Sequence, residues 1–179
     1  MAGGDHAATY LEHAVLDWIR QIVGVPSWNG GILTSRGSVA NLIGLAVMRQ
    51  VKTGSEVRAR GLRSSGPTLV VYTSTEGHSC IQKAIELLGI GHANLRRVPV
   101  TTDWRMDIPA LRRQILEDRT SGLMPACVAA TAGTVNSGAI DSLAEIGEVC
   151  RAENLWFHVD AAYGGPAALA GAVGAVPRD

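Results

Sequence analysis

Short apolar segments alternate with longer amphipathic segments between residues 68 and 160. The apolar segments are five or six residues long, as is typical of strands, and the amphipathic ones have helical spacing. The expected strands are 68–72, 95–100, 127–131 and 155–160; the expected helices are 79–88, one beginning at Asp107, and 141–152 with Asp141 as its cap. Strands joined through helices make right-handed crossovers and lie parallel. The sequence therefore predicts an α/β fold: a mainly parallel sheet with helices on both faces.

Two further helices are predicted before residue 68. Thr9 and Glu12 form a capping-box pattern, apolar residues recur at helical spacing from Leu11 to Ile22, and Gly24 ends that pattern. A second helix is expected over residues 41–51, followed by a surface connection over residues 53–67 that is rich in Gly, Ser and Arg. We divide the chain at residue 30, with an N-terminal helix and turn over 1–30 and the α/β unit over 31–179.

Composition excludes several classes of protein. Sixteen basic and sixteen acidic residues balance to zero charge, so neither nucleic acid nor an anionic membrane is an expected partner. The three cysteines form no CxxC pair and the five histidines lack ligand spacing, so neither disulfides nor a metal site is expected. No signal peptide or membrane span of about 20 apolar residues occurs. We expect a soluble cytoplasmic protein.

Four loops follow the predicted strands or precede the predicted helices at the edge where such sheets bind ligands. These loops are residues 35–38, 73–79, 131–138 and 160–165. In the first, Gly37 and Ser38 stand before a helix, where free backbone N–H groups favour an anion. Ser38 as an ordinary helix cap is an equally good interpretation. The loop matches neither GxxxxGK[ST] nor GxGxxG.

His78 and Thr131 are candidates in the second and third loops. His78 lies between a predicted strand and a predicted helix, and an imidazole there can stack on a planar ring or move a proton. A surface histidine is the simpler alternative. Thr131 begins the segment Thr-Ala-Gly-Thr, which could face the same cleft or form an ordinary turn.

Asp160 ends a strand that is otherwise almost wholly apolar. A buried carboxylate without a partner costs several kcal/mol, so a stabilising partner is required. Asp160 could cap the next turn. Alternatively, it could pair with the protonated ring nitrogen of pyridoxal phosphate, which keeps that cofactor an effective electron sink.

Taken together, residues 31–42, 72–79, 130–134 and 158–165 resemble the group II pyridoxal-phosphate-dependent decarboxylases, relatives of aromatic-L-amino-acid decarboxylase. The similarity runs in order from about residue 9 to residue 165. It implies the fold type I, aminotransferase-like architecture, with residues 31–179 as an incomplete cofactor-binding large domain.

The resemblance also implies the roles of individual residues. Gly37 and Ser38 would hold the phosphate of pyridoxal 5'-phosphate, while His78 would stack on its ring and take part in catalysis. Thr131 would support the polar edge of the cofactor, and Asp160 would pair with its ring nitrogen.

Ala162 would pack against the same ring. The implied reaction is the loss of CO2 from an L-amino acid, with an aromatic one favoured, to give an amine. The full-length enzyme is expected to be a homodimer. Alternatives are another fold type I enzyme (an aminotransferase, a cysteine desulfurase or a phosphosphingolipid-type lyase) and a non-catalytic scaffold or regulatory module.

The sequence departs from the family pattern in two respects. Arg36 stands where the family usually has a small residue, and it could either contact the phosphate or crowd the loop. The family lysine that binds the cofactor covalently lies beyond the Asp160 motif, whereas this chain has only Lys52 and Lys83, upstream of it. We therefore expect an internal piece of the large domain with little or no activity alone.

Overall fold

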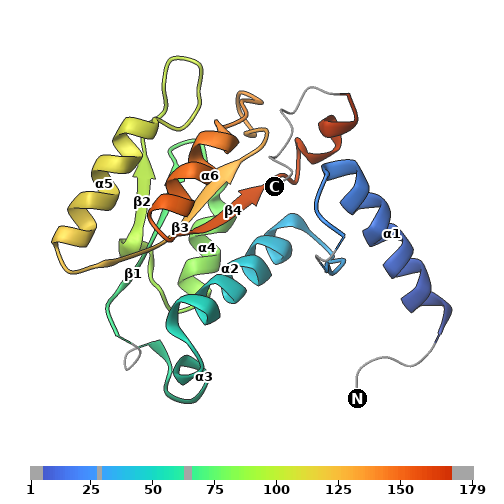
Figure 1. Ribbon diagram of the computed structural model, residues 1–179, viewed down its shortest axis with the longest axis horizontal. Helices are drawn as coiled ribbons and strands as arrows, with labels where there is room; N and C mark the ends of the chain where they lie inside the picture. The colour runs from blue at the N-terminus through green and yellow to red at the C-terminus, as the bar shows by residue number, and fades with distance from the viewer. Residues whose placement is uncertain (1–5, 28–29, 63–65, 171–179) are drawn as a thin grey trace.

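The computed structural model describes residues 6–27, 30–62 and 66–170. Its elements are α1 (Ala7–Val23), α2 (Gly37–Thr53), α3 (Glu56–Arg60), β1 (Leu69–Ser74), α4 (Ser79–Leu87), η2 (His92–Asn94), β2 (Leu95–Val98), α5 (Ile108–Thr120), β3 (Met124–Thr131), α6 (Leu143–Ala152), β4 (Trp156–Asp160) and η3 (Gly165–Ala170). Each strand and helix expected from the alternating pattern is present (Figure 1). The connection 53–67 additionally contains the short helix α3.

The four strands form one parallel sheet in the order β2-β1-β3-β4. Val71 of β1 lies opposite Leu95 and Cys127, and Cys127 lies opposite Trp156. At the carboxyl edge, Thr131 pairs with Asp160, so the loops that follow β3 and β4 begin side by side. The predicted α/β class and parallel sheet are confirmed.

Helices cover both faces of the sheet. Leu69 and Val71 of β1 pack in one apolar cluster with α2 and α4, and the alternate residues Val70 and Tyr72 pack in a second cluster with α5 and α6. This follows from the two-residue period of a strand, which sends successive side chains to opposite faces. Because both faces are buried, β1 is apolar without interruption up to Tyr72.

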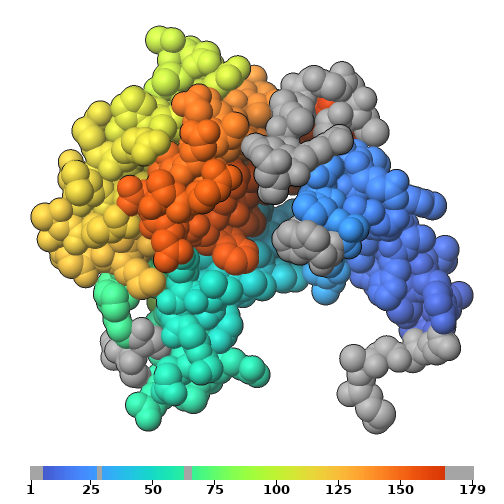
Figure 2. All heavy atoms as spheres, viewed as in Figure 1, coloured from blue at the N-terminus to red at the C-terminus, as the bar shows by residue number. Residues whose placement is uncertain are grey.

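The helix α1 lies at one end of the molecule, beside η3 and away from the strands (Figures 1 and 2). Gly24 is its C-cap, and the left-handed conformation of this glycine (φ 75°) terminates the helix where the sequence predicted. None of its residues is fully buried, and Leu11, Trp18 and Ile19 are exposed. This helix therefore exposes an apolar face to solvent.

Asp141 does not cap α6, contrary to the sequence prediction. The helix begins one residue later, with Ser142 in the cap position and no side-chain cap hydrogen bond. Asp141 is buried, and its two oxygens accept hydrogen bonds from the backbone N–H groups of Met106 (2.7 Å) and Thr131 (2.8 Å). Burial raises the pKa of this carboxyl, although both hydrogen bonds act in the opposite direction. Asp141 thus anchors the end of β3 next to the candidate site.

No helix within residues 6–27, 30–62 and 66–170 is long and apolar enough to cross a membrane.

Candidate functional site

A cavity of about 300 Å³ opens at the carboxyl edge of the sheet. Residues from all four candidate loops line it: Gly37, Ser38, Asn41, Glu76, His78, Cys80, Thr131, Gly133, Thr134, Val135, Asp160, Ala162 and Tyr163. The fold therefore brings together all six residues that the sequence indicated as cofactor-binding. They come from segments up to 125 positions apart in the sequence, from Gly37 to Ala162.

Asp160 is the last residue of β4, and its carboxylate oxygens accept two N–H hydrogen bonds and a long one from the Cys80 thiol. Oδ2 accepts from Nδ2 of Asn41 at 2.9 Å, and Oδ1 accepts from the backbone N–H of Ala162 at 3.2 Å. An ionised carboxylate has about four acceptor positions, so capacity for a further donor remains. These donors orient the carboxylate beside the cavity.

Asn41 was not singled out from the sequence, although the structure places it at the centre of the site. It is only 4% exposed, and its amide contacts Asp160, Cys80 and His158. Nε2 of His158 lies 2.6 Å from Oδ1 of Asn41. Burial lowers the pKa of His158, and the nearby Asp160 opposes that shift. The available signal was a single amide within the apolar run Val39–Ile43 of a predicted helix.

His78 is the N-cap of α4, where its Nδ1 accepts a hydrogen bond from the backbone N–H of Cys80 (3.2 Å). The ring is exposed and lines the cavity, so capping and ligand contact are compatible roles. The Cys80 thiol lies 4.0 Å from Oδ2 of Asp160 and is buried. Burial and then the Asp160 charge raise the thiol's pKa.

The amino terminus of α2 forms another wall. The helix begins at Gly37, and its cap residue Arg36 makes no side-chain cap hydrogen bond. Ser38 is the second helical residue, so its interpretation as the cap is wrong. The first N–H groups of a helix have no partner within it and face outward. A Cβ on Gly37 would lie 3.2 Å from that of Ala162, so a side chain at position 37 would crowd Ala162.

The loops after β3 and β4 interlock at glycine residues. Gly133 has φ +91°, and a Cβ there would lie 2.9 Å from the Tyr163 ring. The Gly164 N–H donates to the carbonyl of Ala132 at 2.9 Å, and a Cβ on Gly164 would overlap that carbonyl oxygen. Thr131, at the start of this arrangement, is buried and lines the cavity.

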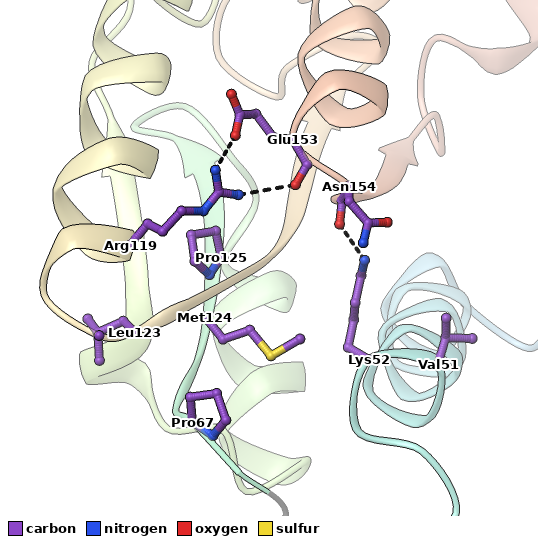
Figure 3. Close-up of a pocket in the computed structure, with 10 residues that line it drawn as sticks. Val51, Lys52, Pro67, Arg119, Leu123, Met124, Pro125, Glu153 and Asn154 are labelled. Carbon is purple, nitrogen blue, oxygen red and sulfur yellow. Dashed lines mark hydrogen bonds and ion pairs between the residues drawn. The ribbon is translucent and has the colours of Figure 1, made fainter.

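A larger cavity of about 500 Å³ lies at the opposite, amino-terminal edge of the strands (Figure 3). Its cationic groups are already engaged. Arg119 pairs with Glu153 at 2.5 Å and also donates to its carbonyl, while Nζ of Lys52 donates to the carbonyl of Asn154 at 2.5 Å. Ligands of parallel sheets bind at the carboxyl edge, so the smaller cavity is the better candidate despite its size.

Neither lysine lines the candidate cavity. Lys52 lies at the amino-terminal edge, and Lys83 is exposed on α4. Arg36 is also exposed and is not a lining residue, so the structure supports neither of the two effects considered for it.

The family model described as the pyridoxal-dependent decarboxylase conserved domain matches residues 5–175. The aromatic-L-amino-acid decarboxylase of Bacillus atrophaeus is 38% identical over 90% of this chain and 32% of its own length. The crystal structure of mouse CSAD in apo form gives a TM-score of 0.82 at 37% identity, covering 89% of this chain and 33% of that one. The Catharanthus roseus tryptophan decarboxylase in complex with L-tryptophan gives 0.79 at 31% identity, covering 91% and 36%.

Proposed function

Because the chain belongs to the pyridoxal-dependent decarboxylase family, we propose that its carboxyl-edge cavity binds pyridoxal 5'-phosphate in an amino-acid carboxy-lyase. The chain spans about one third of the length of the curated relatives it matches. The proposed activity is therefore that of a full-length enzyme that contains this cavity. One observation carries it: a carboxylate held by two N–H donors lines the same cavity as a helix terminus without a side-chain cap.

The polar groups that line the cavity suit both the ring nitrogen and the phosphate of this cofactor. Asp160 is suited to a protonated ring nitrogen because a carboxylate with spare acceptor capacity stabilises a cationic N–H donor. The first backbone N–H groups of α2, at Gly37 and Ser38, together with the Ser38 hydroxyl, are suited to the phosphate. The close approach of Gly37 to Ala162 leaves no space for a larger side chain between them.

The other lining residues would hold the ring. The exposed imidazole of His78 is available to stack on it, and Ala162 would pack against it. Thr131 would contact its polar edge. The bound cofactor would supply an acceptor for the electron pair left by a departing carboxylate. Asp160 would keep the ring nitrogen protonated, and His78 could hold or move a proton at Nε2, since its Nδ1 accepts from the backbone N–H of Cys80.

We propose an L-amino acid as the substrate, with an aromatic one favoured. The names of the B. atrophaeus relative and the C. roseus neighbour support an aromatic substrate, and the L-2,4-diaminobutyrate decarboxylase of Rhizobium meliloti, 37% identical, supports the wider class. A homodimer is proposed because α1 leaves Leu11, Trp18 and Ile19 exposed. A cytoplasmic setting is proposed because the three cysteines are free thiols.

Cofactor binding is tested by titrating the 179-residue chain with pyridoxal phosphate and following its absorbance and fluorescence. We expect saturable binding that Asp160→Asn weakens by about tenfold or more, the value of a hydrogen bond to a charged group. Asp103→Asn, which alters an exposed carboxylate outside the cavity, serves as the control. If binding is absent, or equal in both variants, the proposed site is wrong.

The reaction is tested by supplying 1-¹⁴C-labelled amino acids to the full-length enzyme. A carboxy-lyase releases labelled CO2 and an amine in equal amounts, whereas formation of a keto acid without CO2 would support an aminotransferase instead. The 179-residue chain itself is expected to bind the cofactor with little turnover, because neither lysine lines the cavity. Borohydride should then trap no covalent adduct, and a trapped adduct with CO2 release would contradict this expectation.

A further inference from the structure

Three side chains form a continuous hydrogen-bonded chain behind the cavity. His158 and Asp160 are two residues apart on β4, so both face α2. Asn41 of α2 lies between them, with Oδ1 at 2.6 Å from Nε2 of His158 and Nδ2 at 2.9 Å from Oδ2 of Asp160. Asp160 therefore depends on Asn41 for one of its two N–H donors, and Asn41 is in turn held by His158.

The chemistry of the three groups determines the direction of each hydrogen bond. An ionised carboxylate only accepts, so the amide nitrogen of Asn41 must face Asp160. The amide oxygen then faces His158, which must donate from Nε2. His158 is consequently protonated at Nε2, and any neutral form carries its proton there rather than on Nδ1.

Gly44 limits the position of the imidazole from the next turn of α2. A Cβ at Gly44 would lie 2.9 Å from Cε1 and 3.0 Å from Nδ1 of His158. The helix can approach the ring this closely only because residue 44 lacks a side chain. An alanine there would push the ring away from Asn41 without removing any of the three polar side chains.

We propose that Asn41 and His158 are positioning residues that orient the Asp160 carboxylate toward the ring nitrogen of the bound cofactor. This inference rests on the proposed function, since it assigns Asp160 a cationic partner in the cavity. Asn41 acts on Asp160 directly, and His158 acts through Asn41 by preventing the amide from rotating.

Two pairs of variants test the role of His158. His158→Gln keeps an N–H donor at about the position of Nε2, whereas His158→Leu removes it. We expect pyridoxal phosphate to bind His158→Gln within about threefold of the wild type, and both His158→Leu and Asn41→Ala about tenfold more weakly. Gly44→Ala should weaken binding similarly. Its matched control is Gly147→Ala, another helical glycine, where a Cβ would make an ordinary 3.5 Å contact with Phe157.

Two spectroscopic measurements separate positioning from general loss of structure. In the chain without cofactor, ¹⁵N–¹³C correlation spectra of the histidine rings should show His158 protonated at Nε2. With cofactor ¹⁵N-labelled at its ring nitrogen, that nitrogen should remain protonated in the wild type and in His158→Gln. It should lose protonation in Asn41→Ala and His158→Leu, at a pH where the free cofactor's ring nitrogen is mostly unprotonated.

The outcomes distinguish this inference from the function on which it rests. A wild-type chain that does not bind pyridoxal phosphate overturns both. If the wild type binds and Asp160→Asn weakens binding, but Asn41→Ala and His158→Leu do not, only the positioning role is wrong. A His158 ring protonated at Nδ1 alone also overturns it, whether or not the cofactor binds. Variants are compared only if their circular dichroism matches that of the wild type.

Discussion

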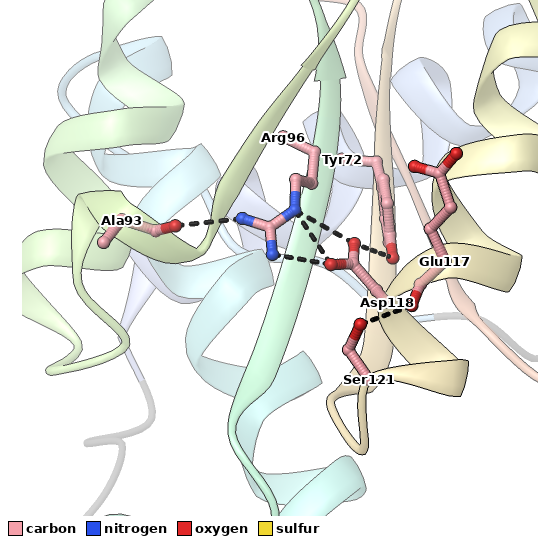
Figure 4. A network of polar contacts seen from close by, with 6 residues as sticks. All are labelled: Tyr72, Ala93, Arg96, Glu117, Asp118 and Ser121. Atoms are coloured by element: carbon pink, nitrogen blue, oxygen red, sulfur yellow. Dashed lines mark hydrogen bonds and ion pairs between the residues drawn. The ribbon is translucent and has the colours of Figure 1, made fainter.

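The phenol of Tyr72 donates a 2.7 Å hydrogen bond to Oδ2 of Asp118, which joins the centre of the sheet to α5 (Figure 4). Arg96 of β2 also binds this carboxylate, with Nη2 at 2.6 Å from Oδ1. Tyr72 is completely buried, and burial followed by the adjacent carboxylate raises its pKa far above the usual range. The phenol therefore stays protonated and acts as a donor throughout the stable pH range.

Tyr72→Phe removes this donor and leaves the ring in place. We expect the free energy of unfolding to fall by about 1–3 kcal/mol, the value of a hydrogen bond to a charged group. Urea denaturation followed by circular dichroism measures it. Tyr163→Phe, at an exposed tyrosine, is the control and should change stability by less than about 0.5 kcal/mol. Equal effects of the two substitutions would show that the buried hydrogen bond contributes nothing.

The buried His158 should make stability depend on pH in the acidic range. Its pKa in the folded chain lies below the ordinary value of 6.5 because burial disfavours the charged ring. The unfolded chain then binds more protons, so stability is full above about pH 6.5 and declines as the pH falls through the folded pKa. His158→Gln should flatten this decline between about pH 7 and pH 5. The exposed His13→Gln variant should retain it, and a wild-type slope in His158→Gln would contradict the assignment.

Adjacent glycines in the turn after Asp160 should respond differently to alanine. At Gly164 a Cβ would lie 2.8 Å from the carbonyl carbon of Ala132, a backbone atom that cannot rotate away. At Gly165 it would lie 3.5 Å from the Cβ of Ala161, an ordinary contact. We expect Gly164→Ala to cost about 1–3 kcal/mol of stability, as overpacking does, and to weaken cofactor binding. Gly165→Ala should do neither, and a similar result for both would mean that the loops do not interlock as described.

The three thiols should be unreactive in the folded chain. Cys80, Cys127 and Cys150 are buried, and burial raises the pKa of each, to about 12 for Cys150. The thiolate is the reactive form, so Ellman's reagent at pH 8 should react slowly before denaturant is added. All three should react promptly afterwards. Rapid release of one equivalent from the native chain would show that a thiol is accessible.

Much of the fold followed from local pattern. Alternating apolar and amphipathic segments predicted each strand of the sheet and the helices between them, because side-chain period and segment length are properties of neighbouring residues. Asp107 illustrates this: the sequence predicted a helix beginning there, and Asp107 caps α5 by accepting from the backbone N–H of Ala110. Asp141 shows where prediction from local pattern fails. It precedes a helix in the same way, yet its partners Met106 and Thr131 were brought to it by the fold.

By itself, the sequence determined the α/β class and the four loops at the ligand-binding edge, because periodicity is local, and its resemblance to the decarboxylase family indicated the six candidate residues. Only the tertiary structure decided that these residues line one cavity and that neither lysine does. It also decided that Asn41 lies between His158 and Asp160, more than 100 positions away. Hydrogen bonds between side chains depend on how α2 packs against β4, and on a glycine at position 44 that lets the helix approach the ring. That packing is a property of the whole chain.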